Sequence, residues 1–178
     1  MGDAAETLKL RFRTHAVAWD ELDAKQAREH IAVHEAGHAV VGLRHGMRLL
    51  DVDIGSDPVA HPDGGFIFGG VRFDAPEGDM KRWARAQPIE TAVVLMAGIC
   101  AEEVLLGCHL RESWMGDVRI VRISHGWLDG MTEFPPEMFV YINDAHQAVT
   151  RSEVAISAVA GALLREGRLT SAEITALV

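Results

Sequence analysis

The chain has 178 residues, which is enough for one domain, and 48% of them are hydrophobic, so it can bury a core without disulfides. Its formal net charge of −9 argues against electrostatic binding to nucleic acid or to an anionic membrane. No apolar run is long enough to span a bilayer, and the N-terminus lacks the apolar region of a secretory signal. The two cysteines, Cys100 and Cys108, are expected to be reduced thiols. We therefore expect a cytoplasmic protein.

Residues 1–19 show no clear period and are interpreted as an N-terminal arm, with a single domain over residues 20–178. Asp20 is predicted to be the N-cap of a long helix, because apolar residues recur after it at helical spacing. No proline interrupts this pattern before His45, and Gly46 is suited to the position after the last turn.

The period changes after this helix. Residues 48–54 alternate between apolar and polar side chains, as a strand does, and residues 55–65 are rich in turn formers. Residues 66–73, "FIFGGVRF", predict a second strand, whose glycine pair indicates a bulge or a close backbone approach.

An apolar helix is predicted over residues 88–106, with Pro88 at its first position and Gly107 at its end. A loop over residues 108–116 follows.

Three further helices are predicted towards the C-terminus. Asp117 opens the first, which runs to about Asp129, and a long helix follows from about residue 137 to residue 165. Thr170 and Glu173 form the capping box of a short final helix. The sequence therefore predicts a mainly α fold with a small β-sheet.

The long first helix contains the motif His34-Glu35-Ala36-Gly37-His38. Histidines four residues apart lie one turn apart on one helix face, so both imidazoles can reach one zinc ion. Glu35 lies at the edge of that face, where it can take a proton from a water molecule that the metal activates. The alternative is a helix with satisfied core histidines and no metal.

A zinc site of this kind needs a third protein ligand. In metzincins a glycine and a histidine follow the second histidine by three and six residues. Here Gly42 and His45 follow His38 by four and seven residues. A continuous helix would place His45 about 10 Å along the axis from His38. Only a break at Gly42 would bring it to the ion.

Three segments carry a resemblance to a known family. "HEAGHAVV" (34–41), "AGICAEEVLLG" (97–107) and a glycine-containing loop that ends at Asp117 resemble the protease domain of the FtsH-type AAA+ zinc metalloproteases. The C-terminal segment 158–178 is similar to the end of that domain, and the likeness extends over about residues 28–178. It implies a helical, zincin-like protease domain with a small sheet whose edge strand lies beside the HExxH helix.

The resemblance implies a role for five residues. His34 and His38 match the two histidine ligands of one zinc ion per chain, Asp117 matches the third ligand, and Glu35 matches the general base. Glu102 matches a residue close to the metal that supports a ligand histidine.

The resemblance also implies where substrate binds. The family adds extended substrate to an edge strand, which corresponds here to Phe66, Ile67, Phe68, Gly69 and Gly70. Trp114 would lie beside the metal and is a candidate to line a side-chain pocket.

The sequence departs from the family pattern in the loop before Asp117. The family usually has Ser-Thr-Gly-Ala and then Asn-Asp, whereas this chain has Ser113-Trp114-Met115-Gly116, so Glu112 remains an alternative third ligand. Without the resemblance, Asp117 is more simply an N-cap. The histidines that show no ligand spacing are interpreted as surface or packing residues: His61, His109, His125 and His146.

A second departure concerns the ATPase module. The 178 residues contain no GxxxxGK[ST] motif, and 33 residues precede His34. We therefore expect a zinc endopeptidase that hydrolyses unfolded or flexible polypeptides without its own ATPase. The alternatives are a non-catalytic zinc-binding or protein-interaction module on the same fold, or a protease subunit that works with a separate ATPase. A homo-oligomer is compatible with either.

Overall fold

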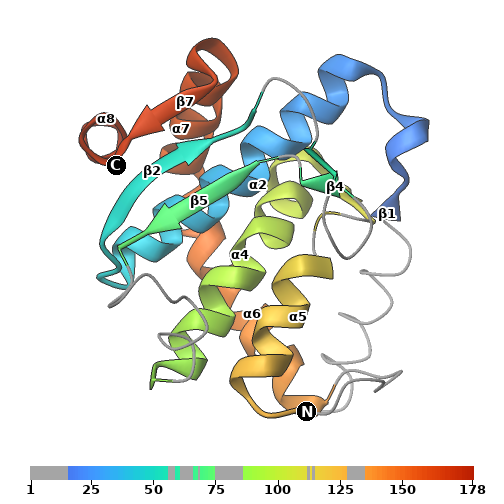
Figure 1. Cartoon of the computed structure of the whole chain (residues 1–178), viewed down its shortest axis with the longest axis vertical. Coiled ribbons are helices and arrows are strands. Elements are labelled where there is room, and N and C mark those ends of the chain that lie inside the picture. The colour runs from blue at the N-terminus through green and yellow to red at the C-terminus, as the bar shows by residue number, and fades with distance from the viewer. Residues whose placement is uncertain are drawn as a thin grey trace.

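The computed structural model describes residues 16–55, 59–60, 66–67, 69–74, 86–111, 113, 115–127 and 135–178. Over these residues the protein is mainly helical with a small sheet, so the predicted fold class is confirmed (Figure 1). Two long helices, α2 (Ala24–Arg44) and α4 (Pro88–Leu106), pack against each other at the centre. None of the described helices is long and apolar enough to cross a membrane.

Helix α2 begins three residues later than predicted. Asp20 lies in a short 3-10 helix, η1 (Trp19–Glu21), and the N-cap is Asp23. The Asp23 carboxylate accepts hydrogen bonds from the backbone N–H groups of Lys25 and Gln26 at 2.9 and 2.8 Å. The Gln26 side chain accepts in return from the Asp23 N–H at 3.0 Å, which completes a capping box.

The remainder of α2 is continuous, as predicted, and ends at Arg44 with His45 as its C-cap. Gly46 follows with a φ of 76°, a left-handed conformation that suits glycine. Gly37 lets α2 approach α4 closely, because a Cβ there would lie 2.6 Å from the Ala97 carbonyl oxygen and 2.7 Å from Ala101 Cβ. The motif helix is therefore fixed against α4 at the position of the motif itself.

Helix α4 has the predicted bounds. Pro88 occupies its first turn, and Gly107, with a φ of 77°, ends it in the left-handed conformation. All residues from 91 to 103 are buried, including two glutamates, so α4 is the central helix of the core.

The predicted long helix over 137–165 is wrong, because the chain forms α6 (Pro136–Thr150) and α7 (Glu153–Glu166) instead. Ser152 separates them with φ −117° and ψ 6°, and its hydroxyl donates to the Ala148 carbonyl at 2.7 Å. The turn lets α6 pack on α4 while α7 packs on α2, which one straight helix could not do.

Helix α5 (Met115–Ser124) begins two residues before Asp117, so Asp117 lies in the first turn and is not the N-cap. The helix ends at Ser124, earlier than predicted, and Asp129 lies outside the described residues. Helix α8 (Ser171–Thr175) has the predicted capping box, in which Glu173 accepts from the Thr170 N–H at 2.7 Å.

The main sheet has three antiparallel strands in the order β5 (Gly70–Phe73), β2 (Leu49–Asp53) and β7 (Arg168–Thr170). It lies along α2, as Figure 1 shows. Strand β2 matches the prediction, whereas β7 was not predicted. The strand predicted over 66–73 is interrupted, because β4 (Phe66–Ile67) pairs with β3 (Val59–Ala60) and Gly69 belongs to no strand.

A separate parallel pair joins β1 (Ala16–Val17) to β6 (His109–Leu110). Strand β6 was not predicted. It lies between α4 and α5 in the chain.

Asp51 links the three strands of the main sheet. On the central strand β2, its carboxylate accepts from Arg72 Nε on β5 at 2.7 Å and from Arg168 Nη2 on β7 at 2.9 Å. The hydrogen bonds from Arg72 and Arg168 lower the pKa of Asp51 to about 2, against the opposing effect of burial. The carboxylate is therefore ionised at neutral pH and bonded to both neighbouring strands.

Candidate metal centre

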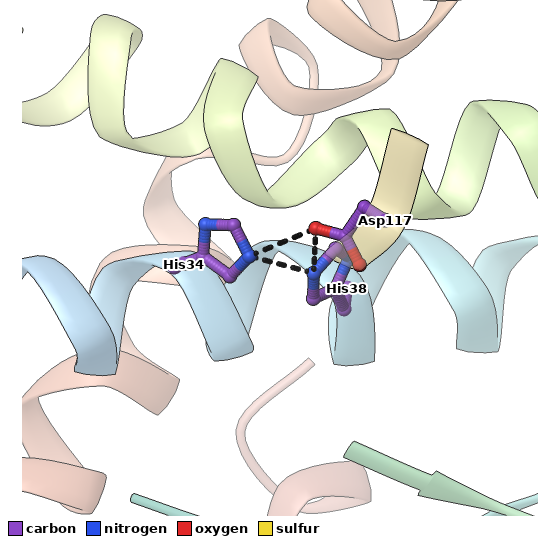
Figure 2. Close-up of side chains that lie close together, drawn as sticks. All are labelled: His34, His38 and Asp117. Atoms are coloured by element: carbon purple, nitrogen blue, oxygen red, sulfur yellow. Dashed lines mark hydrogen bonds and ion pairs between the residues drawn. The ribbon is translucent and has the colours of Figure 1, made fainter. Parts of the chain in front are cut away.

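Three predicted ligands converge at one point (Figure 2). His34 Nε2 lies 2.9 Å from His38 Nε2 and 3.2 Å from Asp117 Oδ2, and His38 Nε2 lies 3.3 Å from the same carboxylate oxygen. The histidines come from α2 and the aspartate from the first turn of α5. Among the residues that the structure describes, no other group of three His, Cys, Asp or Glu side chains offers ligand atoms within 4.8 Å of one another.

The separations suit a small tetrahedral ion. Zinc bonds of about 2.0–2.2 Å place tetrahedral ligand atoms about 3.4 Å apart. The three observed distances, from 2.9 to 3.3 Å, fall within about 0.5 Å of that value. Two imidazole nitrogens and one carboxylate oxygen are also a donor set that zinc prefers.

The hydrogen-bond partners assign the tautomers of both histidines. His38 Nδ1–H donates to the Val94 carbonyl at 2.8 Å, and His34 Nδ1–H donates to Glu102 at 2.7 Å. In a neutral imidazole the other nitrogen, Nε2, then carries a lone pair. Two lone pairs and a carboxylate oxygen therefore face one another, an arrangement that favours a cation between them.

The acidic side chains attract positive charge to the site, whether a proton or a metal cation. Burial alone would lower the pKa of His34, but hydrogen bonds and charges from Asp117 and Glu102 raise it well above its usual value. Burial opposes ionisation of Asp117, yet the two histidines lower its pKa to about 2. The acids thus stabilise positive charge at the point where the three side chains meet.

Gly98 on α4 leaves the space for the two imidazoles. A Cβ built there would lie 2.6 Å from both His34 Nε2 and His38 Nε2, closer than real contacts allow. The central helix therefore presents bare backbone to the site. Gly98 lies within the family-like segment "AGICAEEVLLG" (97–107), but the sequence alone predicts no role for it.

Glu102 lies behind His34 and is fully buried. Its Oε1 accepts from His34 Nδ1 at 2.7 Å and from Ser113 Oγ at 2.8 Å. Its Oε2 accepts from His30 Nδ1 at 2.7 Å and from the Leu110 N–H at 2.8 Å. Glu102 is thus in contact with a candidate ligand, the position that the family resemblance implied for it.

Glu35 is buried on α2 beside the three converging side chains. Burial raises the pKa of Glu35 above its usual value, while the charges of His34 and His38 oppose that shift. Gly69 packs directly on it, because a Cβ there would lie 3.1 Å from Glu35 Cγ. The predicted close backbone approach is therefore confirmed at Gly69, just before β5.

The metzincin alternative is wrong for this fold. Helix α2 does not break at Gly42, where a Cβ would lie 2.5 Å from the Phe73 ring. His45 is the exposed C-cap of that helix and does not belong to the converging group.

Other predicted positions fall where little is described. Glu112, Phe68, Trp114 and His61 lie outside the described residues, and Phe66 and Ile67 are described only as backbone of β4. Gly70 begins β5, next to Gly69. His109 contacts Glu103 at 3.0 Å, and His125 contacts the Tyr141 hydroxyl at 3.0 Å, so both have structural partners away from the converging group.

Two side chains that contact Glu102 were not predicted from the sequence. They are His30 and Ser113. His30 precedes His34 by four residues, so the series His30, His34, His38 extends one helix face by a further turn. That spacing was a signal that could have found His30. Ser113 carries no comparable signal, since its contact depends on the path of the chain after β6.

The fold and the site together define a mainly helical protein with a candidate two-histidine, one-aspartate metal centre. No family model matches the chain. It is 35% identical over 86 residues to "ATP-dependent zinc metalloprotease FtsH 2" and 36% identical over 86 residues to "ATP-dependent zinc metalloprotease FtsH 3", both of Sphaerobacter thermophilus. These matches cover 47% and 48% of this chain but 12% and 16% of the relatives. The chain therefore has a partial and distant similarity to the FtsH zinc metalloproteases.

Proposed function

We propose that this protein is a zinc-dependent endopeptidase that hydrolyses peptide bonds of unfolded or flexible polypeptides. The observation that carries the proposal is the convergence of His34, His38 and Asp117 beside the buried Glu35. The similarity to two proteins named zinc metalloproteases supports it.

His34, His38 and Asp117 would hold one zinc ion. When bound, the ion supplies a Lewis acid, which lowers the pKa of a water molecule towards neutrality and polarises a carbonyl. Glu102 would hold the His34 ring in the tautomer whose Nε2 is free, and the Val94 carbonyl would do the same for His38.

Glu35 would move the proton. Its raised pKa brings the carboxyl group closer to a neutral working pH, where a general base transfers protons most effectively. It would accept a proton from the attacking water on its carboxylate oxygen and return it to the leaving amine of the cleaved peptide. Its buried position also keeps bulk water from competing for that proton.

Strand β5 would position the substrate. It is one of the two edge strands of the main sheet and follows directly after Gly69, which contacts Glu35. An extended polypeptide that pairs with this edge would pass the general base, and backbone pairing tolerates many sequences. Only an unfolded or flexible chain can offer an extended segment in this way.

A second candidate follows from the names of the two relatives. Because both are ATP-dependent, this chain is a candidate peptidase unit that works with an ATPase. Co-purification with an ATPase, and stimulation of proteolysis by ATP in that complex alone, would favour it.

The first prediction tests the proposed chemistry at Glu35. Glu35→Gln should abolish cleavage of unfolded casein while bound zinc, measured by mass spectrometry of the metal, stays at one ion per chain. Glu29→Gln is the matched control, because Glu29 is exposed on the same helix, and it should cleave like the wild type. Cleavage by Glu35→Gln at the wild-type rate contradicts the proposal. Zinc without turnover in the wild type supports a non-catalytic module instead.

A further inference from the structure

His30 is a buried histidine outside the converging group, with a relative exposure of 5%. It lies on α2 one turn before His34, and its Nδ1 is 2.7 Å from Glu102 Oε2. His34 Nδ1 makes the equivalent contact with the other carboxylate oxygen, also at 2.7 Å. One carboxylate thus joins two successive turns of the motif helix.

The hydrogen-bonding capacity of Glu102 is filled. A carboxylate has about four lone-pair directions, two on each oxygen. His30 and the Leu110 N–H occupy Oε2, and His34 and Ser113 occupy Oε1. With every acceptor site used and no exposed surface, Glu102 has one orientation that satisfies all its partners.

The opposite side of His30 is consistent with donation from Nδ1. His30 Nε2 lies 3.8 Å from Cys108 Sγ, and a thiol is a weak donor that can face a ring lone pair. Nδ1 is then the protonated nitrogen, and His30 donates to Glu102. His30 is therefore a donor to the carboxylate and does not compete with His34 as an acceptor.

We propose that His30 is a positioning residue of the metal centre, which acts through Glu102 to fix the ring orientation and tautomer of His34. This inference rests on the proposed function in one respect, that the centre binds zinc. Removing the His30 donor leaves Oε2 with one partner in a buried environment, so the carboxylate is held less firmly in the orientation that contacts His34. His34 Nδ1 then loses its acceptor, and Nε2 is no longer held towards the ion.

The experiment compares two amide replacements of His30. An asparagine amide reaches about as far as imidazole Nδ1, so His30→Asn can still donate to Glu102. A glutamine amide reaches about as far as Nε2, so His30→Gln places its donor beyond Glu102, towards Cys108. Loss of a hydrogen-bond partner that orients a metal ligand typically lowers metal affinity about 10- to 100-fold.

Zinc affinity is measured by competition with a chromophoric chelator, and the site is also loaded with Co²⁺ to record its absorption spectrum. We expect His30→Gln to bind zinc about 10- to 100-fold more weakly than the wild type with an altered Co²⁺ spectrum. His30→Asn should stay within about threefold of the wild type, which is below the loss of about 10- to 100-fold expected when the hydrogen bond to Glu102 is removed.

His109→Gln is the matched control. His109 is also buried and also contacts a buried glutamate of α4, Glu103, at 3.0 Å. We expect it to lower the melting temperature of the metal-free protein and to leave zinc affinity unchanged. Equal loss of affinity in His30→Gln and His109→Gln would reduce the role of His30 to general stability and overturn the inference.

Wild-type affinity in His30→Gln would also overturn it, as would a loss of affinity in His30→Asn as large as that in His30→Gln. The proposed function fails by a different result, namely zinc binding by the wild type without cleavage of any unfolded polypeptide. In that case the affinity series still decides the role of His30, because it needs no turnover.

Discussion

At the scale of single residues, the candidate centre depends on the absence of a side chain at Gly98 as much as on the ligands. Gly98 allows α4 to lie against the two Nε2 atoms, and no other residue fits that space. The glycine is on the central helix, where its neighbours cannot move aside without disturbing the packing of α2 on α4.

Gly98→Ala should therefore weaken both the fold and the site. We expect a loss of about 1–3 kcal/mol in the free energy of unfolding from overpacking, and a loss of about tenfold or more in zinc affinity as the rings shift. Urea denaturation and chelator competition measure the two effects.

Gly161→Ala serves as the control for this substitution. Gly161 lies within α7, and a Cβ there meets only Arg165 Nη1, at an ordinary 3.7 Å. Alanine should stabilise this helix by about 0.5–1 kcal/mol without any change in zinc affinity. If Gly98→Ala behaves in the same way as Gly161→Ala, the rings are not held against α4 as the structure indicates.

Some residues of the site could be predicted from the sequence, and others could not. His34, Glu35 and His38 follow from helical spacing alone, because four residues make about one turn. Asp117 is distant in sequence from the His34–His38 motif, and by itself it predicts only an N-cap. Its prediction as a ligand therefore depended on the family resemblance alone. Gly98 acts through the space it leaves, which becomes visible only when α4 is placed against α2.

At the scale of elements, boundaries with a local chemical signal were predictable. Pro88 and Gly107 delimit α4, and the Thr170–Glu173 capping box begins α8. Strands β6 and β7 have two and three residues, too few for a period to show, and tertiary pairing alone defines them. The break between α6 and α7 was missed because it serves packing on two different helices.

The three-stranded sheet should lose stability in acid through Asp51. Its folded-state pKa of about 2 is below the value of about 3.9 in an unfolded chain. The contribution of Asp51 is therefore fully present above about pH 4 and is lost as the pH falls towards about 2. We expect the free energy of unfolding of the wild type to exceed that of Asp51→Asn most above pH 4, and the difference to shrink below it.

Urea denaturation of both proteins over this pH range measures that difference. Asp144→Asn, at an exposed position on α6, should show little difference from the wild type at any pH. A constant gap between the wild type and Asp51→Asn down to pH 2 would mean that the arginines do not stabilise the ionised carboxylate.

At the scale of the whole molecule, the candidate centre joins elements that are otherwise connected weakly. Asp117 brings α5 to α2, while the described part of α5 buries only Val118 and Val121. Most of the buried core residues come instead from α2, α4, α6 and α7. A bound ion would therefore act as a crosslink between a well-packed core and a lightly packed helix.

Zinc should consequently stabilise the fold and protect α5 in particular. Free zinc at 100 times its dissociation constant adds about 2.7 kcal/mol, which raises the melting temperature of a chain of this length by about 5–10 °C. We expect a chelator to remove that increase and to accelerate amide hydrogen exchange in α5 far more than in α4. Asp117→Asn should lose most of the increase, since an amide oxygen is a poorer zinc ligand than a carboxylate. If zinc raised the melting temperature of Asp117→Asn as much as that of the wild type, the ion would be bound without α5, and the third ligand would have to be sought elsewhere in the chain.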